Sequence, residues 1–346
     1  MNCEKVRVVG RVMPVEDTLW LALSGTGVEF FVKGKSAQVT FVADDTWNGV
    51  PENRVRVAVY VDGIRVEDTL LDSPEKTVTA FVSEQEESHV VRVIKLSESA
   101  MSTCGISDIS AEGEFFATEP KKRLVEFVGD SITCGYGVDD EDRDHHFATG
   151  TEDVTRAYAY KTAKALDVDY SMVSFSGYGI VSGYTASGEK MGHQLVPDYY
   201  EKFGFSYGTY KGEYKPQNVT WDFTKHQPDC VVINLGTNDM SYVLEDKDRR
   251  EEYIDGYVNF LKTVRKNNCD ARIVCVLGMM GEALCTAVKE TVERYGNETG
   301  DTRVSYMGFH DQLPEDGYVA DWHPTETTHT KAAKKLTEEI RRIMVW

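Results

Sequence analysis

The chain has 346 residues, of which 41% are hydrophobic, and it carries a formal net charge of −19. This length and apolar content suffice for two domains with ordinary cores, without disulfide or metal staples. The strong negative charge argues against nucleic acid and anionic membrane surfaces as partners. No stretch approaches the roughly 18 apolar residues of a membrane span, so we expect no membrane partner.

The cysteines favour a reducing compartment, because their number is odd and none forms a Cys-x-x-Cys pair. The first residues contain no apolar segment typical of a signal peptide. We therefore expect a cytoplasmic monomer, or a secreted protein if a leader has been removed. The seven cysteines are Cys3, Cys104, Cys134, Cys230, Cys269, Cys275 and Cys285.

The N-terminal third has almost only strand patterns. Residues 28–33 and 37–42 are β-rich, and residues 54–61 and 89–96 alternate polar and apolar side chains. Turn signals at Lys33-Gly34-Lys35 and Asp62-Gly63 separate them. We predict a β-sandwich or jelly-roll domain over residues 1–118, followed by a polar, proline-containing linker at 119–123.

From residue 119 to residue 346 the pattern changes to alternating strands and helices, which predicts a largely parallel sheet covered by helices on both faces. The predicted strands are 124–128, 169–175, 229–235, 271–277 and 304–309. The predicted helices are 154–166, 249–267, 284–295 and 325–344.

The first strand of this second domain ends abruptly at Gly129-Asp130-Ser131. A hydroxyl at the carboxyl end of a strand in an open α/β sheet is a candidate nucleophile. The alternative is that Asp130 and Ser131 only cap the following helix, because both residue types are common N-caps.

A nucleophilic serine needs a base, and the best candidate is His323 in the segment Asp321-Trp322-His323. This histidine follows the last strand, so it can return to the sheet edge that carries Ser131. Asp321 is the candidate partner for the imidazole. Metal binding by Asp321 and His323 is the alternative, but no further ligands occur at a recognisable spacing, and we expect neither metal nor organic cofactor.

Two further strand ends carry groups suited to an oxyanion. The strand 229–235 ends in Gly236-Thr-Asn-Asp239, where the amide of Asn238 can donate to a developing negative charge. The segment Ser174-Phe-Ser-Gly-Tyr-Gly179 supplies backbone N–H groups, with Gly177 free of side-chain obstruction. The alternative for Asn238 is a simple turn cap.

This chain resembles the SGNH (GDSL-like) hydrolase superfamily, because four of its strand ends carry, in this order, Ser131, Gly177, Asn238 and His323. The resemblance implies a flavodoxin-like three-layer α/β/α domain with Ser131 as nucleophile and Gly177, Asn238 and the Ser131 N–H as the oxyanion hole. The preceding β-sandwich and the Asp-Trp-His-Pro segment are similar to carbohydrate esterase family 2. One departure is that the superfamily's Asp-x-x-His would place aspartate at position 320, which is alanine. Either Asp321 or a backbone carbonyl therefore orients His323.

Candidate substrate contacts lie beside these residues. We predict that Trp322, Tyr178 and Asp130 contact the substrate, although Trp322 is nearly as suited to core packing. The aromatic-rich segment 193–221 is a candidate sugar platform, and its alternative is a loop packed on the body by its own aromatics. The neighbouring pair His145-His146 is more typical of a solvated loop than of a metal site.

The resemblance implies a carbohydrate O-acetyl esterase for polysaccharide degradation. It would remove acetyl groups, including 6-O groups, from xylan-, mannan- or glucan-derived oligosaccharides through an acyl-serine intermediate. One alternative is a short-chain lipase or thioesterase of the same superfamily. The other is a non-catalytic carbohydrate-binding protein.

Overall fold

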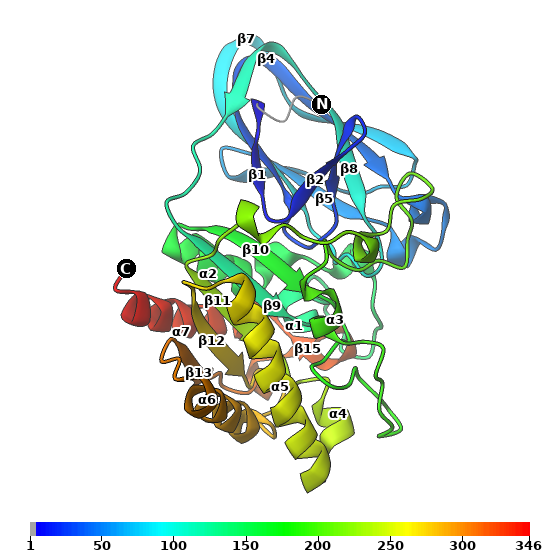
Figure 1. Ribbon diagram of the computed structural model, residues 1–346. Helices are drawn as coiled ribbons and strands as arrows, with labels where there is room; N and C mark the ends of the chain where they lie inside the picture. The colour runs from blue at the N-terminus through cyan, green and yellow to red at the C-terminus, as the bar shows by residue number, and fades with distance from the viewer. Residues whose placement is uncertain (1–4) are drawn as a thin grey trace.

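The computed structural model describes residues 5–346, so the prediction for Cys3 lies outside the described residues. Two sheets stand one above the other, the N-terminal one in blue and cyan (Figure 1). The strands of the first sheet are β1 Arg7–Val9, β2 Val12–Val15, β3 Thr18–Leu21, β4 Gly27–Ala43, β5 Arg56–Val61, β6 Ile64–Leu70, β7 Glu75–Lys95 and β8 Cys104–Ala117. Those of the second are β9 Leu124–Gly129, β10 Asp169–Ser174, β11 Cys230–Asn234, β12 Arg272–Leu277 and β13 Val304–Gly308.

The N-terminal sheet is antiparallel, with strand order β2-β3-β8-β4-β7-β5-β6 and β1 paired to β4. The turn predicted at Asp62-Gly63 is present, and both residues have positive φ as a tight hairpin requires. The turn predicted at Lys33-Gly34-Lys35 is wrong. The chain continues through it as the single strand β4, and the glycine instead marks a register shift between Gly34 and Ser36.

The second sheet is parallel, with strand order β10-β9-β11-β12-β13. In chain order this is 2-1-3-4-5, the flavodoxin-like arrangement, so the predicted fold class is confirmed. The connection after β9 runs to β10, whereas the connection after β11 runs the opposite way to β12, which opens a crevice beyond the carboxyl ends of β9 and β11. Gly129 ends β9 opposite Asn234, the last residue of β11.

Helices cover both faces of this sheet. One apolar core contains buried side chains of α5 (Lys247–Asn267) and α6 (Cys285–Thr299), including the predicted apolar face of α5. The other core contains side chains of α2 (Tyr158–Leu166) and α7 (Glu326–Met344). The helix predicted from residue 154 begins later, because Ala157 is extended after a short 3₁₀ turn. The remaining short elements are α1 Ser131–Cys134, α3 Val196–Tyr200, α4 Met240–Val243, β14 Tyr318–Val319 and β15 His323–Pro324.

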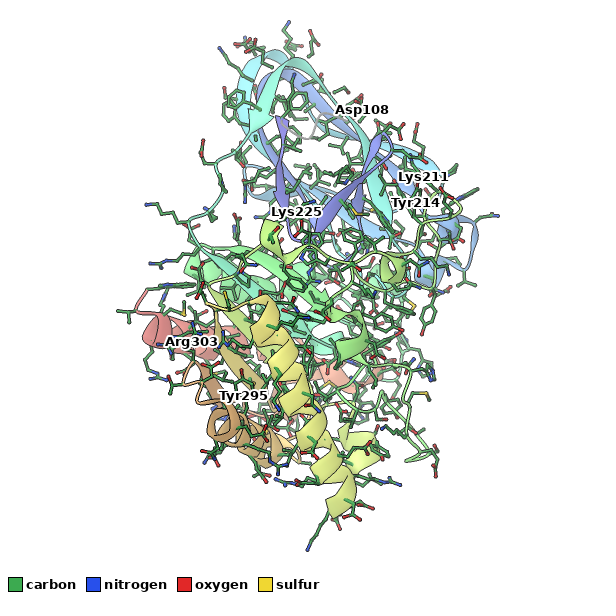
Figure 2. All side chains as sticks on the ribbon, in the orientation of Figure 1. Asp108, Lys211, Tyr214, Lys225, Tyr295 and Arg303 are labelled. Atoms are coloured by element: carbon green, nitrogen blue, oxygen red, sulfur yellow. The ribbon has the colours of Figure 1, made fainter. Side chains whose placement is uncertain are left out.

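The aromatic segment 193–221 packs between the two sheets, which favours the packed-loop alternative over the predicted sugar platform. Four of its eight large aromatic side chains are buried, and Tyr210 stacks on Trp20 of β3 with ring centroids 5.3 Å apart. Figure 2 shows Lys211 and Tyr214 of this segment beside the N-terminal sheet. The side chains buried in this way are Tyr200, Phe203, Tyr210 and Trp221.

Ion pairs also join the N-terminal sheet to the second domain. Arg11 is fully buried, donates to the carbonyls of Tyr200 and Lys202, and pairs with Glu126 of β9 at 3.1 Å. Arg7 pairs with Asp169 at the start of β10. A buried charge is stable only when it is paired, so these contacts fix the two domains against each other. Within residues 5–346, no helix is long and apolar enough to cross a membrane.

Candidate active site

The nucleophile turn is built by three residues at the end of β9. A Cβ on Gly129 would lie 2.1 Å from Thr133 Oγ1, so only glycine lets the chain turn this tightly into α1. Asp130 is fully buried and caps α1, because its Oδ1 accepts the N–H of Ile132 at 3.1 Å. The prediction that Asp130 contacts substrate is therefore wrong. Ser131 follows at the first position of α1, with its hydroxyl at the crevice.

Ser131 and His323 are brought together as predicted. The Ser131 Oγ lies 2.9 Å from His323 Nε2. His323 Nδ1 lies 3.1 Å from the carbonyl oxygen of Ala320. A carbonyl can only accept, so Nδ1 carries the proton and Nε2 is left to accept the serine proton. Burial lowers the pKa of His323 to about 4, which keeps the imidazole neutral and ready to act as a base at neutral pH.

The orienting group is the Ala320 carbonyl, so the prediction that the Asp321 carboxylate holds His323 is wrong. Asp321 accepts a hydrogen bond from Tyr136, and its Oδ1 lies 2.8 Å from Nδ1 of His146. The cause is the backbone, since Asp321 and Trp322 both have left-handed φ values of 50° and 62°. This turn points the Ala320 carbonyl at the imidazole and the Asp321 side chain away from it.

Gly177 lies in the crevice beside Ser131. Its φ is +83°, which favours glycine, and a Cβ there would meet nothing within 4 Å. None of the described residues accepts a hydrogen bond from its N–H, whereas its carbonyl accepts the N–H of Tyr184 at 2.8 Å. The Gly177 N–H is thus available to a ligand in the crevice.

Asn238 lines the same crevice from the end of β11. Its Nδ2 donates to the Tyr178 carbonyl at 2.9 Å and to Asp130 Oδ2 at 3.3 Å. Donation to a substrate oxygen would replace the longer of these contacts. The Tyr178 side chain is buried against Phe175 and Phe205, so the prediction that it contacts substrate is wrong.

Two residues support the site without having been singled out in the sequence. Tyr136 stacks on the His323 ring with centroids 3.9 Å apart, and its hydroxyl donates to Asp321. Asp239, next to Asn238, is fully buried and accepts the N–H groups of Ile180, Val181 and Ser182. The sequence could have pointed to Asp239, because it lies in the motif that follows β11. No local pattern could have pointed to Tyr136, because it stacks on a residue 187 positions away in the sequence.

The crevice has a volume of about 700 Å³. Trp322 is on its rim, 47% exposed, with the guanidinium of Arg143 stacked 4.1 Å from the ring centroid. Tyr184 is on the rim as well and is 60% exposed. The lining is formed by Ser131, Tyr136, Gly177, Tyr184, Thr237, Asn238, Met240, Ser241, Met280, Asp321, Trp322 and His323.

Two groups of side chains carry atoms of the kind that bind metal ions. His145 contacts Asp140 and His146 contacts Asp321, so each histidine faces a carboxylate rather than the other histidine. Among the described residues, the group with spacing suited to an ion is Glu98, Cys134 and Glu152, which is buried beneath the crevice.

A serine hydroxyl bonded to a neutral histidine, at the carboxyl edge of a flavodoxin-like sheet, defines a serine hydrolase of the acyl-transfer type. Residues 127–331 match the GDSL-like lipase/acylhydrolase family, and residues 8–120 match the carbohydrate esterase 2 N-terminal domain. The chain therefore belongs to the GDSL-like hydrolases of carbohydrate esterase family 2, which confirms the resemblance seen in the sequence.

Named relatives agree with this assignment. The chain is 31% identical to the cellulase/esterase CelE of Acetivibrio thermocellus over 94% of its length, but it spans only 38% of that protein. It is 27% identical to an acetylxylan esterase/glucomannan deacetylase of Cellvibrio japonicus, covering 99% of this chain and 89% of the relative. A family two carbohydrate esterase from Clostridium thermocellum, solved with cellohexaose, is 30% identical with a TM-score of 0.85 and 99% coverage of both chains.

Proposed function

We propose that this protein is a carbohydrate O-acetyl esterase acting on acetylated xylan-, mannan- or glucan-derived oligosaccharides, including 6-O-acetyl groups. The observation that carries the proposal is the 2.9 Å contact between Ser131 Oγ and His323 Nε2 within a crevice of about 700 Å³. The names of the relatives, an acetylxylan esterase/glucomannan deacetylase and an esterase solved with cellohexaose, support the substrate class.

The geometry gives each group a role. Ser131 Oγ attacks the acetyl carbonyl carbon while its proton passes to His323 Nε2, and the carbonyl π electrons move to oxygen. The N–H groups of Gly177 and Ser131 and the amide of Asn238 stabilise that oxyanion, each donor contributing about 10²–10³ in rate. Collapse of the intermediate expels the sugar alkoxide, which takes the proton from His323. A water molecule then attacks acetyl-Ser131 by the same steps, releasing acetate.

The crevice also favours sugars over long acyl chains. Its rim carries two exposed aromatic side chains, Trp322 and Tyr184, whose faces suit the C–H surfaces of pyranose rings. Its wall carries polar groups such as Thr237 and Ser241, which suit sugar hydroxyls. A long acyl chain would cover the Thr237 hydroxyl without offering it a hydrogen bond, whereas the Ser241 hydroxyl is already bonded to Asn238 and Thr185.

The test is acetate release from acetylated oligosaccharides followed by time-resolved NMR, with Ser131→Ala as the inactive control. We expect loss of acetyl signals with the parent protein and none with the variant. Faster hydrolysis of p-nitrophenyl octanoate than of the acetate would favour the lipase or thioesterase alternative. Oligosaccharide binding without acetate release would favour the non-catalytic alternative.

A further inference from the structure

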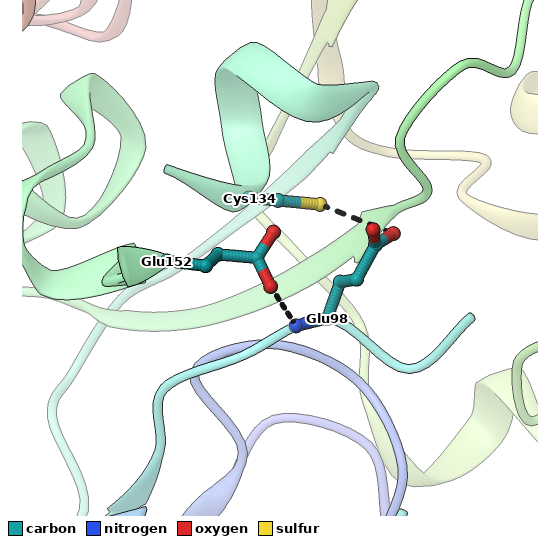
Figure 3. A group of neighbouring side chains, drawn as sticks. All are labelled: Glu98, Cys134 and Glu152. Atoms are coloured by element: carbon teal, nitrogen blue, oxygen red, sulfur yellow. Dashed lines mark hydrogen bonds between the residues drawn. The ribbon is translucent and has the colours of Figure 1, made fainter. Parts of the chain in front are cut away.

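The loop between β7 and β8 of the N-terminal sheet reaches beneath the active site. Residues 95–100 of this loop are almost completely buried. Figure 3 shows Glu98 from this loop with dashed lines to Glu152 and to Cys134, the last residue of α1. The loop therefore contacts the helix that carries Ser131.

Glu98 makes one contact that bears directly on the crevice. Its Oε2 accepts the backbone N–H of Ser176 at 2.8 Å. The next N–H along the chain is that of Gly177, a residue that lines the crevice, and this N–H has no acceptor among the described residues. The N–H of Ser176 is thus bound by Glu98, whereas the N–H of Gly177 remains available to a ligand.

We propose that Glu98 is a positioning residue for the oxyanion site: by binding the Ser176 N–H, it anchors the peptide unit immediately before the one that presents the Gly177 N–H to the developing oxyanion. This inference rests on the proposed function, because the oxyanion forms only if Ser131 attacks an ester. It gives the N-terminal domain a direct part in catalysis, since no residue of the second domain supplies this acceptor in the structure.

Glu98 is itself held from several sides. Its N–H donates to Glu152 Oε2 at 2.6 Å, and its carbonyl accepts from the ammonium of Lys95 at 3.0 Å. The thiol of Cys134 lies 4.0 Å from Glu98 Oε2. The first two contacts fix the backbone of Glu98, and complete burial limits the movement of its side chain, as a positioning role requires.

The carboxyl also has to be compatible with a nearby oxyanion. Burial raises the pKa of Glu98, and burial together with the charge of Glu98 raises that of Glu152. The remaining oxygen of each, Glu98 Oε1 and Glu152 Oε1, is buried without a hydrogen-bond partner. Two buried carboxyls in such proximity favour protonation of at least one of them, which reduces negative charge behind Gly177.

The same three groups offer ligand atoms within 4.8 Å of one another, a spacing that a metal ion could also use. One observation favours the positioning role instead. Glu98 Oε2 already accepts the Ser176 N–H, so binding an ion through this oxygen would compete with that hydrogen bond.

The test uses the full-length protein with Glu98→Ala, Glu98→Asp and Glu98→Gln. Alanine removes the acceptor, aspartate withdraws it by one methylene, and glutamine retains an acceptor oxygen while its amide can donate to Glu152.

The substrate is p-nitrophenyl acetate. We expect kcat of the alanine and aspartate variants to fall about 10- to 100-fold, which reaches the loss caused by removing one oxyanion donor, while KM stays within about threefold of the parent value. Glutamine should retain kcat within about threefold. Arg7→Ala, which breaks the remote interdomain pair with Asp169, is the matched control and should also retain kcat.

A second readout does not depend on activity. Hydrogen–deuterium exchange of the peptide containing Ser176 and Gly177 should accelerate in Glu98→Ala and Glu98→Asp but not in Glu98→Gln or Arg7→Ala. If the parent protein hydrolyses no acetyl ester, the proposed esterase function fails while the exchange data still report on Glu98. Folded Glu98→Ala and Glu98→Asp with parental kcat and exchange would overturn the proposal. So would a glutamine variant as impaired as alanine, or stoichiometric zinc in the parent that Glu98→Ala loses.

Discussion

Replacing Asp321 by asparagine distinguishes two ways of supporting the catalytic histidine. In a Ser-His-Asp triad the carboxylate binds the imidazole N–H, and conversion to the amide costs about 10⁴ in kcat. Here the Ala320 carbonyl binds Nδ1, and the Asp321 carboxylate contacts Tyr136 and His146 instead. The substitution therefore leaves the imidazole tautomer unchanged and removes only a nearby negative charge.

The size of that charge effect follows from the position of the carboxylate. The Asp321 carboxylate favours the imidazolium that forms in the transition state. If it raised the pKa of His323 by one full unit, the imidazolium would be stabilised by about 1.4 kcal/mol, which corresponds to a tenfold change in rate. The Asp321 side chain is 36% exposed, so water screens part of this interaction. We expect kcat/KM of Asp321→Asn to fall by no more than about tenfold.

The assay is steady-state hydrolysis of p-nitrophenyl acetate, with circular dichroism as the check on folding. His323→Ala should lose about 10⁴-fold or more, because no other base contacts Ser131. Asp142→Asn is the control: it removes an exposed charge from the neighbouring loop and should leave kcat/KM unchanged. A loss above about 10³-fold in a folded Asp321→Asn protein would refute the reasoning and restore Asp321 as the group that orients the histidine.

Three other predictions concern pH and stability. Since burial lowers the pKa of His323 to about 4 and only the neutral imidazole accepts a proton, kcat/KM should rise with pH through a midpoint near 4; a midpoint at or above 6.5 would contradict this. Gly177→Ala forces an L side chain to φ +83° and should lower the free energy of unfolding by about 1–2 kcal/mol, measured by urea denaturation, whereas an unchanged urea midpoint would argue against that backbone conformation. Arg11→Met leaves Glu126 buried without its cation and should cost about 3–5 kcal/mol in the same experiment. The double variant with Glu126→Gln should recover part of that loss, and a single-variant cost below about 1 kcal/mol would show that the pair is not buried in solution.

Much of the fold follows from local pattern. Strands such as β11 and β12 were predictable because each is a short apolar run, and the buried face of α5 was predictable from its helical spacing. The errors arose where one local signal permits two structures. Lys33-Gly34-Lys35 is suited both to a turn and to a bulge, and only pairing with β7 and β8 keeps the chain extended there.

The aromatic segment 193–221 shows the same limit. A run of aromatics with interspersed glycines fits an exposed sugar platform as well as a packed loop. The segment packs because Trp20, which lies more than 170 residues earlier in the sequence, offers a buried surface for Tyr210 and Phe203. The rim of the crevice is instead formed by Tyr184 and Trp322.

By itself, the sequence determined the class of chemistry and its main residues, Ser131 and His323. Small and polar residues at the ends of buried strands must meet at one edge of a parallel sheet, so their order along the chain carries this information. Only the tertiary structure decided what holds those residues. The histidine is oriented by the Ala320 carbonyl, and the oxyanion loop is bound by Glu98 of the other domain. Every residue has a carbonyl, and a distant glutamate has no fixed spacing to its partner, so neither contact leaves a pattern in the sequence.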